Sequence, residues 1–357
     1  METTRYILPA EWYPQSAIQL TWPHEATDWA PYLDDITDTF VQLAQVIVMR
    51  ERLIIATQDP DDVLHRLRKA IPRRAMHRVS FCQCDIDDTW ARDHGALTLL
   101  PFTDSYLKCG EGGVRAITLK FKFNGWGGKF PSEHDNNIAG RLFADGHLTR
   151  QFEDHSDFVL EGGAIESDGR GTIMTTTQCQ MKRNQPLSRE QIEEELKHRL
   201  HANRVIWIDH GHLAGDDTDG HIDTIVRMAP RNLLLYTCCD DPRDEHYDDF
   251  QALEQQMKTL RNAEGKPYRL MRLPLPDPIY EEADGHRLPA TYANFLAINQ
   301  AVILPTYNQP DKDNEAARVL AAAFPYHQIR PLDARTIIRQ HGSIHCLTMQ
   351  FPKGTAK

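Results

Sequence analysis

The chain has 357 residues, of which 41% are hydrophobic and 25% are charged, and its formal net charge at pH 7 is −11. This acidic balance argues against a nucleic-acid-binding protein, because phosphate backbones need a basic surface. No apolar run approaches the roughly 20 residues that span a bilayer, and residues 1–6 lack the basic and apolar regions of a signal peptide. We therefore expect a cytoplasmic protein that binds neither nucleic acid nor membrane.

The seven cysteines are an odd number in a chain that is neither short nor typical of secreted proteins, so we expect no disulfide framework. Cys82 with Cys84 and Cys238 with Cys239 lack the spacing and the matching pairs of a structural zinc site. The sequence has 17 histidines but no H-E-x-x-H motif. We therefore expect neither a metal nor a cofactor.

In the first half of the chain, helical and strand patterns alternate. Apolar residues recur at helical spacing over residues 32–50, and Asp59 with Pro60 supplies an N-cap and a first-turn proline for a helix over residues 61–70. Strand patterns cover residues 52–57, 79–84, 96–100 and 116–123. The last of these strands ends in a glycine-rich loop, in which Trp126 either covers a functional site or packs in the core.

The second half repeats this alternation. A hairpin turn is predicted at Asp168-Gly169, and Ser188 with Gln191 forms a capping box for a helix that ends near residue 200. Further strands are predicted at residues 158–160, 172–177, 204–208, 232–238, 268–273, 295–304 and 329–332 and around Cys346, and further helices at 247–260 and 313–324. Helices recur at even intervals and no linker divides the chain, so we expect a single α/β domain over residues 1–357, built of several similar modules.

Four clusters of polar residues stand at the ends of apolar strands, where functional side chains usually gather. They are residues 90–93, 161–163, 217–223 and 345–346. If residues 220–223 are extended, His221 and Asp223 point to one face, so that an imidazole and a carboxylate address one site. Each cluster alone is equally compatible with an exposed turn or a surface ion pair. Their coincidence in one chain points to a functional site.

Together the clusters offer the thiol of Cys346, the imidazole of His221 and several carboxylates. Cys346 is a candidate nucleophile, because a nucleophilic cysteine needs a neighbouring acid or base such as His221, itself oriented by a carboxylate. Further carboxylates raise the pKa of a nearby thiol and oppose thiolate formation. A planar guanidinium cation removes this conflict, because paired carboxylates accept its N–H donors. The residue types therefore favour a guanidinium substrate over the peptide substrate of a papain-like protease.

Several motifs, taken in order, resemble those of the agmatine deiminase family, which is grouped with the Porphyromonas-type peptidylarginine deiminases in the guanidino-group-modifying superfamily. They are Pro9-Ala10-Glu11-Trp12, Trp90-x-x-Asp93, Leu160-Glu161-Gly162-Gly163, Gly220-His221-Ile222-Asp223 and Ile344-His345-Cys346. The resemblance extends over nearly the whole chain. It implies a five-bladed α/β propeller (pentein) of ββαβ-type modules with pseudo-fivefold symmetry. It also implies metal-free hydrolysis of agmatine to N-carbamoylputrescine and ammonia.

By this resemblance Cys346 is the nucleophile, His221 is the general acid and base, and Glu161 is the carboxylate that orients His221. Asp93 and Asp223 are expected to hold the guanidinium nitrogens. A covalent thiouronium adduct of Cys346 is then hydrolysed by water. The substrate pocket is expected to include three further residues: Trp90, Asp217 and Gly342.

Other functions stay compatible with the sequence. Within the same chemistry the runner-up is deimination of peptidyl-arginine or free arginine, and transfer of the amidine to an amine is a further alternative. A catalytically silent guanidinium-binding protein is disfavoured, since a binding protein has no use for the thiol of Cys346. The expected partners are a small cationic guanidine such as agmatine and, on the resemblance alone, further copies of the chain in a homo-oligomer.

Overall fold

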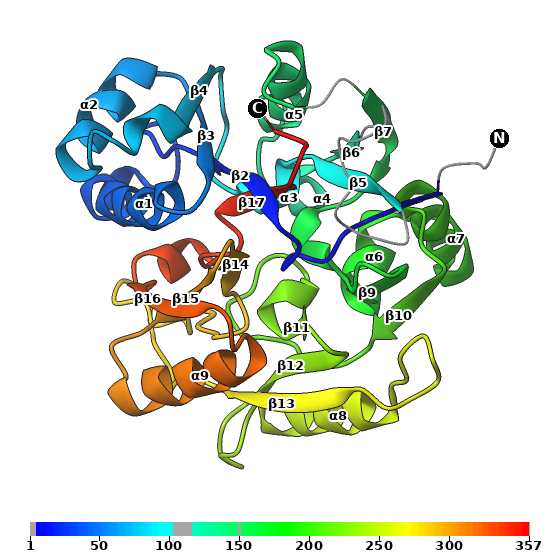
Figure 1. Cartoon of the computed structure of the whole chain (residues 1–357). Coiled ribbons are helices and arrows are strands. Elements are labelled where there is room, and N and C mark those ends of the chain that lie inside the picture. Colours follow the sequence, from blue (N-terminus) through cyan, green and yellow to red (C-terminus); the bar gives the residue numbers. More distant parts are fainter. Residues whose placement is uncertain (1–4, 103–115, 149–150, 357) are drawn as a thin grey trace.

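This computed structural model describes residues 5–102, 116–148 and 151–356. It is a mixed α/β structure in which five small sheets lie toward the centre and the longer helices lie around them (Figure 1). Among the described residues, no helix combines the length and the apolar character that a membrane span requires.

The five sheets take their strands from successive parts of the chain. Both ends of the chain meet in one sheet, with the order β17 (Thr348–Pro352), β2 (Gln15–Thr21), β3 (Arg52–Thr57) and β4 (Val79–Gln83). A second sheet has the order β1 (Arg5–Ile7), β5 (Leu97–Phe102), β6 (Ile117–Lys122) and β7 (Gln151–Val159). The other sheets contain β8 (Ile165–Ser167), β9 (Thr172–Thr176) and β10 (Arg204–Ile208); β11 (Val226–Ala229), β12 (Leu233–Cys238) and β13 (Arg269–Pro274); and β14 (Leu296–Ile298), β15 (Ala301–Thr306) and β16 (Gln328–Asp333).

Every sheet contains the same three-strand unit, an antiparallel pair followed by a parallel pair. The units are β17–β2–β3, β5–β6–β7, β8–β9–β10, β11–β12–β13 and β14–β15–β16. A parallel pair needs a long crossover, and each crossover here contains at least one helix. These helices are α1 (Leu33–Val48), α5 (Asp135–Ala144), α6 (Thr177–Arg183) with α7 (Arg189–Leu200), α8 (Tyr247–Thr259) and α9 (Pro310–Ala323). A further helix, α2 (Pro60–Ala70), joins β3 to the parallel strand β4.

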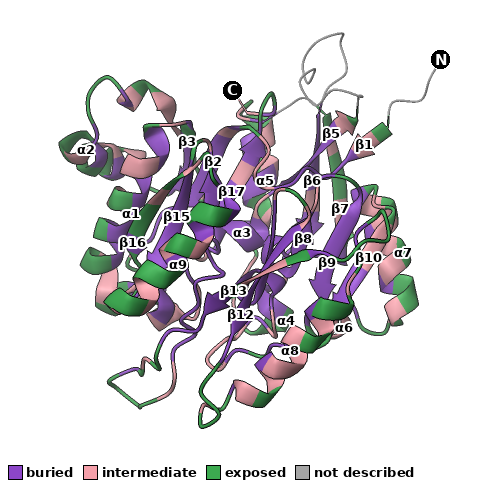
Figure 2. Cartoon of the chain, turned by 60° about the horizontal axis from the view of Figure 1, so that its bottom comes forward, coloured by how far each residue is buried: buried purple, intermediate pink, exposed green. Residues whose placement is uncertain are grey.

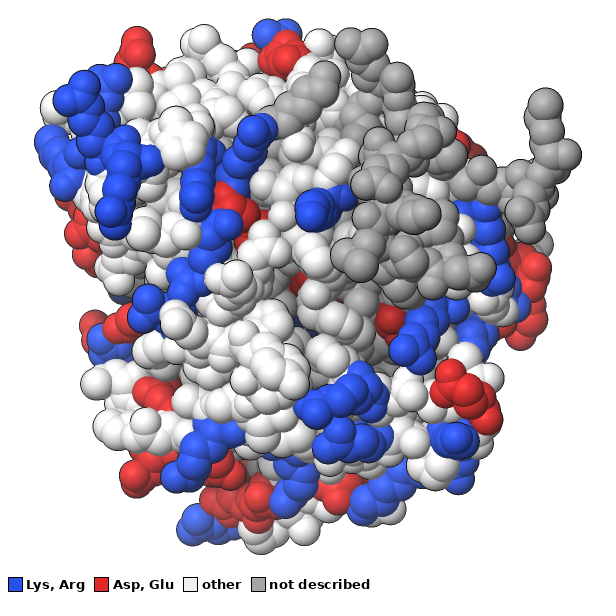
Figure 3. Space-filling model, in the orientation of Figure 1, with Lys and Arg blue, Asp and Glu red and all other residues white. Residues whose placement is uncertain are grey.

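Local sequence explains where two of these helices begin. The side chain of Asp59 accepts hydrogen bonds from the first backbone N–H groups of α2, and Ser188 with Gln191 forms the predicted capping box of α7. Apolar side chains of α1 face the core, and Phe40 and Leu43 are completely buried. Figure 2 shows the same division for the whole molecule, with buried strands inside and partly exposed helices outside. Acidic and basic side chains are interspersed on the face in Figure 3.

Several regions differ from the sequence prediction. The strand predicted around Cys346 begins only at Thr348, and Cys346 lies in the turn before it. Residues 295–304 form not one strand but the hairpin of β14 and β15, whose turn places Gln300 at a φ of 63°. The elements β2, α5 and α6 have no counterpart among the predicted elements, because polar residues interrupt their apolar patterns. In β2, for example, Gln19 and Thr21 are completely buried, which their polarity does not indicate.

The two ends of the chain are joined through the pairing of β17 with β2. The hydroxyl of Ser16 donates to the carbonyl of Pro352, although the two residues are 336 positions apart in the sequence. Because of this pairing, the turn that carries Cys346 lies beside the N-terminal segment that carries Glu11.

Candidate active site

The predicted clusters meet because they occupy equivalent places in the sheets. Asp93, on the short helix α3 (Ala91–His94), lies shortly before β5, Gly163 before β8, Asp223 before β11, and Cys346 before β17. In the remaining sheet Asn294 lies shortly before β14. The side chains of the four non-glycine residues are all buried. Every sheet therefore contributes one segment to a single site.

The thiol of Cys346 lies in a turn and is 3% exposed. Its Sγ is 3.4 Å from Oδ1 of Asn294 and 3.9 Å from Oδ2 of Asp223. Burial, followed by the negative charges of Asp223 and Asp93, raises the pKa of this thiol well above its usual value. The thiol therefore stays neutral unless a positive charge enters the site.

His221 faces the same space from the segment before β11. The structure places Ile222–Thr224 in a 3-10 helix, so the predicted extended conformation of this segment is wrong. His221 itself stands before this helix with an extended backbone, and both His221 and Asp223 are completely buried at the site. The inference that the two side chains address one site is thus correct, although the local geometry that suggested it is not.

The imidazole of His221 lies between two carboxylates. Its Nε2 is 2.8 Å from Oε2 of Glu161, whereas its Nδ1 is 3.7 Å from Oδ1 of Asp93 and has no hydrogen-bond partner among the described residues. Burial alone would lower the pKa of His221, but the charge of Asp93 and the hydrogen bonds of Cys179 and Glu161 raise it well above its usual value. His221 therefore holds a proton beside an open side of the site.

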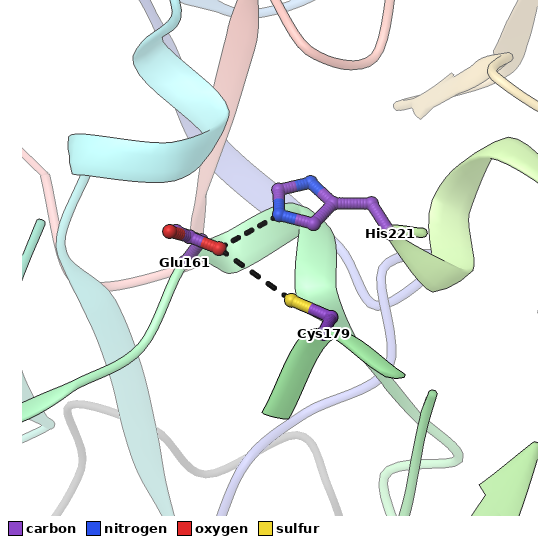
Figure 4. A group of neighbouring side chains, drawn as sticks. All are labelled: Glu161, Cys179 and His221. Carbon is purple, nitrogen blue, oxygen red and sulfur yellow. Dashed lines mark hydrogen bonds and ion pairs between the residues drawn. The ribbon is translucent and has the colours of Figure 1, made fainter. Parts of the chain in front are cut away.

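Glu161 is completely buried behind His221, and Figure 4 shows its contacts with His221 and Cys179. Its second oxygen accepts a hydrogen bond of 2.6 Å from Nε of Arg183. Burial would raise the pKa of Glu161, but the hydrogen bond and charge of His221 and the charge of Arg183 lower it. Glu161, Cys179 and His221 also have ligand atoms within 4.8 Å of one another, a spacing suited to a metal ion. The guanidinium of Arg183 already supplies positive charge to Glu161, which suits this carboxylate to orienting an imidazole.

Asp93 is held by two donors. Nε1 of Trp126 donates to its Oδ2 at 2.9 Å, and the backbone N–H of Gly163 donates to its Oδ1 at 3.0 Å. Burial, partly offset by His221 and reinforced by the charges of Glu161 and Asp223, raises the pKa of Asp93 to about 6. A cationic ligand would stabilise the ionised form of this carboxyl group.

Asp223 presents one bonded and one open oxygen. Its Oδ2 lies 2.6 Å from Nδ1 of His345, whereas its Oδ1 is buried and finds no hydrogen-bond partner in the part of the chain that the structure describes. Burial would raise the pKa of Asp223, but the hydrogen bond and charge of His345 lower it. Because an unsatisfied buried carboxylate oxygen is costly, Oδ1 is a natural acceptor for a ligand N–H group.

Gly163 leaves room between these groups. A Cβ atom at this position would lie 2.6 Å from Nδ1 of His221, 2.9 Å from Oδ1 of Asp93 and 3.1 Å from Oδ2 of Asp223. Three polar side chains thus converge on a space that a glycine keeps open. This is the close approach that the Glu161-Gly162-Gly163 motif predicts.

A pocket of about 390 Å³, counted to its open mouth, leads to Cys346 and Asp93. The predicted residues Trp90, Asp217 and Gly342 all line it, and the ring of Trp90 covers Gly342 so closely that a Cβ there would lie 2.1 Å from it. The other lining residues are Asp28, Asp88, Trp126, Phe130, Thr218, Gln340 and His341. Among the described residues, no lysine or arginine lines this pocket.

The mouth of the pocket is acidic. Burial, partly offset by a hydrogen bond from Thr89, raises the pKa of Asp88 to about 6, and burial also raises the pKa of Asp217. Asp219 is different, because hydrogen bonds from Lys182, Arg183 and Lys129 outweigh its burial and lower its pKa. Among the described residues Asp88 and Asp217 form no ion pair, whereas Asp219 is engaged by Lys129, Lys182 and Arg183.

Some residues of the site are absent from the sequence prediction, namely Asn294, Arg183 and Asp88. Asn294 would have been found if residues 295–304 had been interpreted as a hairpin, because it then stands where the other sheets place their site residues. For Trp126 the structure combines both alternatives, since its ring is buried and also lines the pocket. A larger cavity lies elsewhere and contains none of the predicted site residues.

Comparison with known proteins identifies relatives along the whole chain. The family model of Porphyromonas-type peptidyl-arginine deiminase matches residues 7–352. An agmatine deiminase of Stutzerimonas stutzeri is 30% identical, over 97% of this chain and 95% of that protein. Among solved structures, an agmatine deiminase of C. jejuni with substrate bound is 34% identical, with a TM-score of 0.87 over 99% of this chain and 98% of that chain.

A solved protein of Porphyromonas gingivalis, described as a candidate arginine deiminase, is 44% identical, with a TM-score of 0.89 over 99% of this chain and all of that chain. The matches therefore cover the sheets, the helices and the segments that form the site. The chain belongs to the Porphyromonas-type peptidyl-arginine deiminase family.

Proposed function

We propose that this protein is an agmatine deiminase, which hydrolyses the guanidinium group of agmatine to N-carbamoylputrescine and ammonia. The observation that carries the proposal is the convergence of a buried thiol, two buried carboxylates and an imidazole on the space beside Gly163. Within the described residues, two atoms that border this space, Nδ1 of His221 and Oδ1 of Asp223, are buried without partners. A planar cation with several N–H groups suits the carboxylates of Asp93 and Asp223 as acceptors, and it leaves the proton of His221 free for a departing nitrogen.

The first half of the proposed reaction forms a covalent adduct. Asp93 and Asp223 hold the guanidinium plane, and the arriving cation offsets the negative charges that raise the pKa of the Cys346 thiol. The Cys346 thiol releases its proton to solvent, the resulting thiolate attacks the guanidinium carbon, and His221 protonates the departing nitrogen, which leaves as ammonia. Glu161 keeps the imidazole in place throughout.

The second half hydrolyses the adduct. His221, now neutral, takes a proton from a water molecule that attacks the carbon of the thiouronium group. Collapse of the intermediate expels Cys346 and leaves a ureido product. Each proton transfer by a positioned acid or base contributes about 10²–10⁴-fold to the rate. The proposed reaction needs no metal or cofactor.

The charge of the pocket supports agmatine over free arginine. The terminal ammonium of agmatine suits the acidic mouth formed by Asp28, Asp88 and Asp217. The α-carboxylate of arginine would meet the same acidic groups with no lining lysine or arginine to bind it. The closeness of Trp90 to Gly342 narrows the entrance, which supports a small molecule over a peptidyl-arginine.

The test is a colorimetric assay for ureido product with agmatine, arginine and a blocked arginyl peptide, using the wild type beside Cys346→Ala. We expect product from agmatine that disappears in the variant. Product from arginine or the peptide alone would support a deiminase mechanism but refute agmatine as the substrate. A thiol-reactive amidine that labels Cys346 no faster than the other cysteines would favour a silent guanidinium-binding protein. Product that carries an added amine would indicate an amidinotransferase.

Further parts of the proposal concern architecture and setting. The repeated three-strand unit supports a five-bladed α/β propeller with pseudo-fivefold symmetry, formed by a single domain over residues 1–357. We also propose a cytoplasmic location and a homo-oligomer, with no nucleic-acid or membrane partner. Light scattering on the purified protein tests the oligomer, and a monomer at micromolar concentration would refute it.

A further inference from the structure

A second imidazole lies behind the proposed site, between two carboxylates. Nδ1 of His345 is 2.6 Å from Oδ2 of Asp223, and its Nε2 is 2.5 Å from Oε2 of Glu11. All three side chains are largely or completely removed from solvent, and His345 directly precedes Cys346 in the chain. This arrangement connects Asp223 to the N-terminal segment.

Both contacts of His345 are short and suit hydrogen bonds donated by its ring. Burial would raise the pKa of Glu11, but the charges of Arg227 and His345 lower it far below its usual value, and the pKa of Asp223 is also lowered. Nδ1 of His345 faces Asp223 and its Nε2 faces Glu11, and Nη2 of Arg227 also lies 3.1 Å from Nε2. Two ionised carboxylates can only accept hydrogen bonds, so the ring of His345 is the group placed to donate to them. The group is then held together by two charge-assisted hydrogen bonds.

Glu11 is itself fixed in place from two sides. Nη2 of Arg227, in β11, lies 2.7 Å from its Oε2, and the backbone N–H of Ala297, in β14, donates to its Oε1 at 2.7 Å. Arg227 is completely buried and also bonds Glu166. The position of Glu11 is thus determined by two sheets other than the one that carries Cys346.

We propose that Glu11 and His345 are positioning residues that hold the carboxylate of Asp223 ionised and turned so that its open oxygen faces the substrate. They do so without touching the substrate, since the pocket is lined by neither. This inference rests on the proposed function, in which Asp223 binds the guanidinium. It assigns a role in catalysis to the N-terminal Glu11, which lies 334 positions from His345 in the sequence.

Other charged or titratable groups surround His345 and its two carboxylate partners, and they also affect the pH dependence of activity. Around His345 and Asp223 they are Arg227, Glu166, Arg92, His221, Asp93 and Cys346. Of these described residues, Arg227 alone forms ion pairs with both Glu11 and Glu166. Glu166 therefore offers a matched control: it is as buried as Glu11 and shares Arg227, but it makes no hydrogen bond to His345.

The experiment measures kcat/KM for agmatine against pH in the full-length protein and in Glu11→Gln, Glu11→Asp and Glu166→Gln. In Glu11→Gln the contact that fixes the ring of His345 weakens, so the hydrogen bond between His345 and Asp223 loosens and Asp223 becomes easier to protonate. We expect kcat/KM to fall roughly 10–100-fold, the range for a displaced catalytic geometry. We also expect the ionisation of Asp223, which in the wild type lies below that of Asp93, to move upward by about one pH unit on the acid limb.

The size of the shift should follow the contact with His345. Glu11→Asp keeps the charge but lengthens the contact, so its acid limb should move in the same direction by less, and that of Glu166→Gln should move least. This order can be measured from Glu11→Asp and Glu166→Gln alone if Glu11→Gln does not fold. An equal fall in rate at every pH with no shift, or a larger shift in Glu166→Gln than in the Glu11 variants, would overturn the proposal.

A second readout separates this inference from the proposed function. Alkylation of Cys346 by 2-chloroacetamidine needs the guanidinium-binding carboxylates but no turnover, so its rate is followed against pH in the same variants. If the wild type makes no ureido product from agmatine, the proposed function fails. The size of the pH shift of the labelling rate, compared among the variants, still tests the roles of Glu11 and His345. If the wild type turns over agmatine while labelling and turnover are unshifted in both Glu11 variants, only the present inference fails.

Discussion

Two sets of buried side chains in this molecule have the same arrangement but differ in the length of one contact between an imidazole and a carboxylate. Asp93, His221 and Glu161 form a carboxylate–imidazole–carboxylate row, and Asp223, His345 and Glu11 form another. In each row an arginine binds the outer carboxylate, Arg183 at Glu161 and Arg227 at Glu11. The inner contact, however, is 3.7 Å at His221 and 2.6 Å at His345.

This difference separates a group that can move a proton from a group that holds a position. Nδ1 of His221 has no hydrogen-bond partner within the described part of the chain, so a proton there is available to a ligand in the pocket. Both nitrogens of His345 are engaged by carboxylates, at 2.6 Å and 2.5 Å, so neither is open to a ligand. Similar residues thus acquire different tasks from about one ångström of spacing.

The largest effect on activity is expected from a substitution in the row of Asp93, His221 and Glu161, in which Nδ1 of the imidazole is open to a ligand. In His221→Asn the acid and base of both half-reactions is removed, so kcat should fall by about 10²–10⁴-fold. Binding of agmatine should survive, because Asp93 and Asp223 are unchanged. Steady-state kinetics measures the fall, and calorimetry on the Cys346→Ala background measures the binding. A fall in kcat of less than tenfold would mean that the two rows do not differ as proposed.

A substitution of the same kind in the row of Asp223, His345 and Glu11 should act mainly on the stability of the protein and on the position of Asp223. His345→Asn removes a donor from two buried carboxylates, which should cost about 3 kcal/mol of unfolding free energy. The kcat/KM should fall by about 100-fold through misplacement of Asp223. Denaturant unfolding and the ureido assay give the two numbers. An intact stability with activity lost as completely as in His221→Asn would mean that His345 transfers protons as well.

Filling the space between the rows tests whether they converge on one ligand. In Gly163→Ala the new methyl group would contact His221, Asp93 and Asp223, so substrate should be excluded and kcat/KM should fall by about 100-fold. The thermal unfolding temperature should change less than in His345→Asn. Gly128→Ala is a useful control, because a Cβ there meets no atom within 4 Å, although its positive φ carries a backbone cost.

The pH dependence of the wild type should distinguish the two inner carboxylates. The pKa of Asp93 is raised to about 6 and that of Asp223 is lowered, so on acidification Asp93 takes up a proton first. Since its charge holds the guanidinium, kcat/KM should fall about tenfold per unit below pH 6. The pH profile of kcat/KM measures this limb. A profile that stays flat to pH 5 would show that Asp93 is ionised by its surroundings as Asp223 is.

The smallest effect is expected at the mouth of the pocket. Asp88→Asn removes one of several carboxylates there, so KM for agmatine should rise by only about fivefold, in keeping with a partly screened ion pair. The kcat should be unchanged, because Asp88 contacts neither His221 nor Cys346. Kinetics with methylguanidine, which has no distal ammonium, supplies the control. An equal rise in the KM for methylguanidine would contradict the proposal that Asp88 attracts the distal ammonium of agmatine.

Much of this site could be predicted from sequence because its residues come as short motifs before strands. Trp90 with Asp93, Glu161 with Gly163, and the pair His345-Cys346 were informative as local patterns, and the structure brings them together. The fold prediction succeeded for long amphipathic segments such as α1 and failed where strands are short or polar. It therefore missed the hairpin of β14 and β15.

What could not be predicted depends on pairs that are distant in sequence. Glu11 meets His345 across 334 positions and Arg227 across 216 positions, and none of these residues carries a pattern that names its partner. The length of a contact between two side chains cannot be predicted from the sequence either. The chain contains both His221 and His345, but only the packing decides which imidazole is left open.

The pairing of β17 with β2 also has a consequence for biosynthesis. β2 is made early, yet its antiparallel neighbour is supplied only after more than 300 further residues have left the ribosome. Until then the edge of β2 is unpaired, and the thiol of Cys346 has no place in the molecule. A nascent chain that stalls before residue 346 would thus be both inert and exposed at a strand edge, a state that quality-control proteases can recognise. Enzymatic competence and completion of the sheet would appear in one step, once β17 has been made.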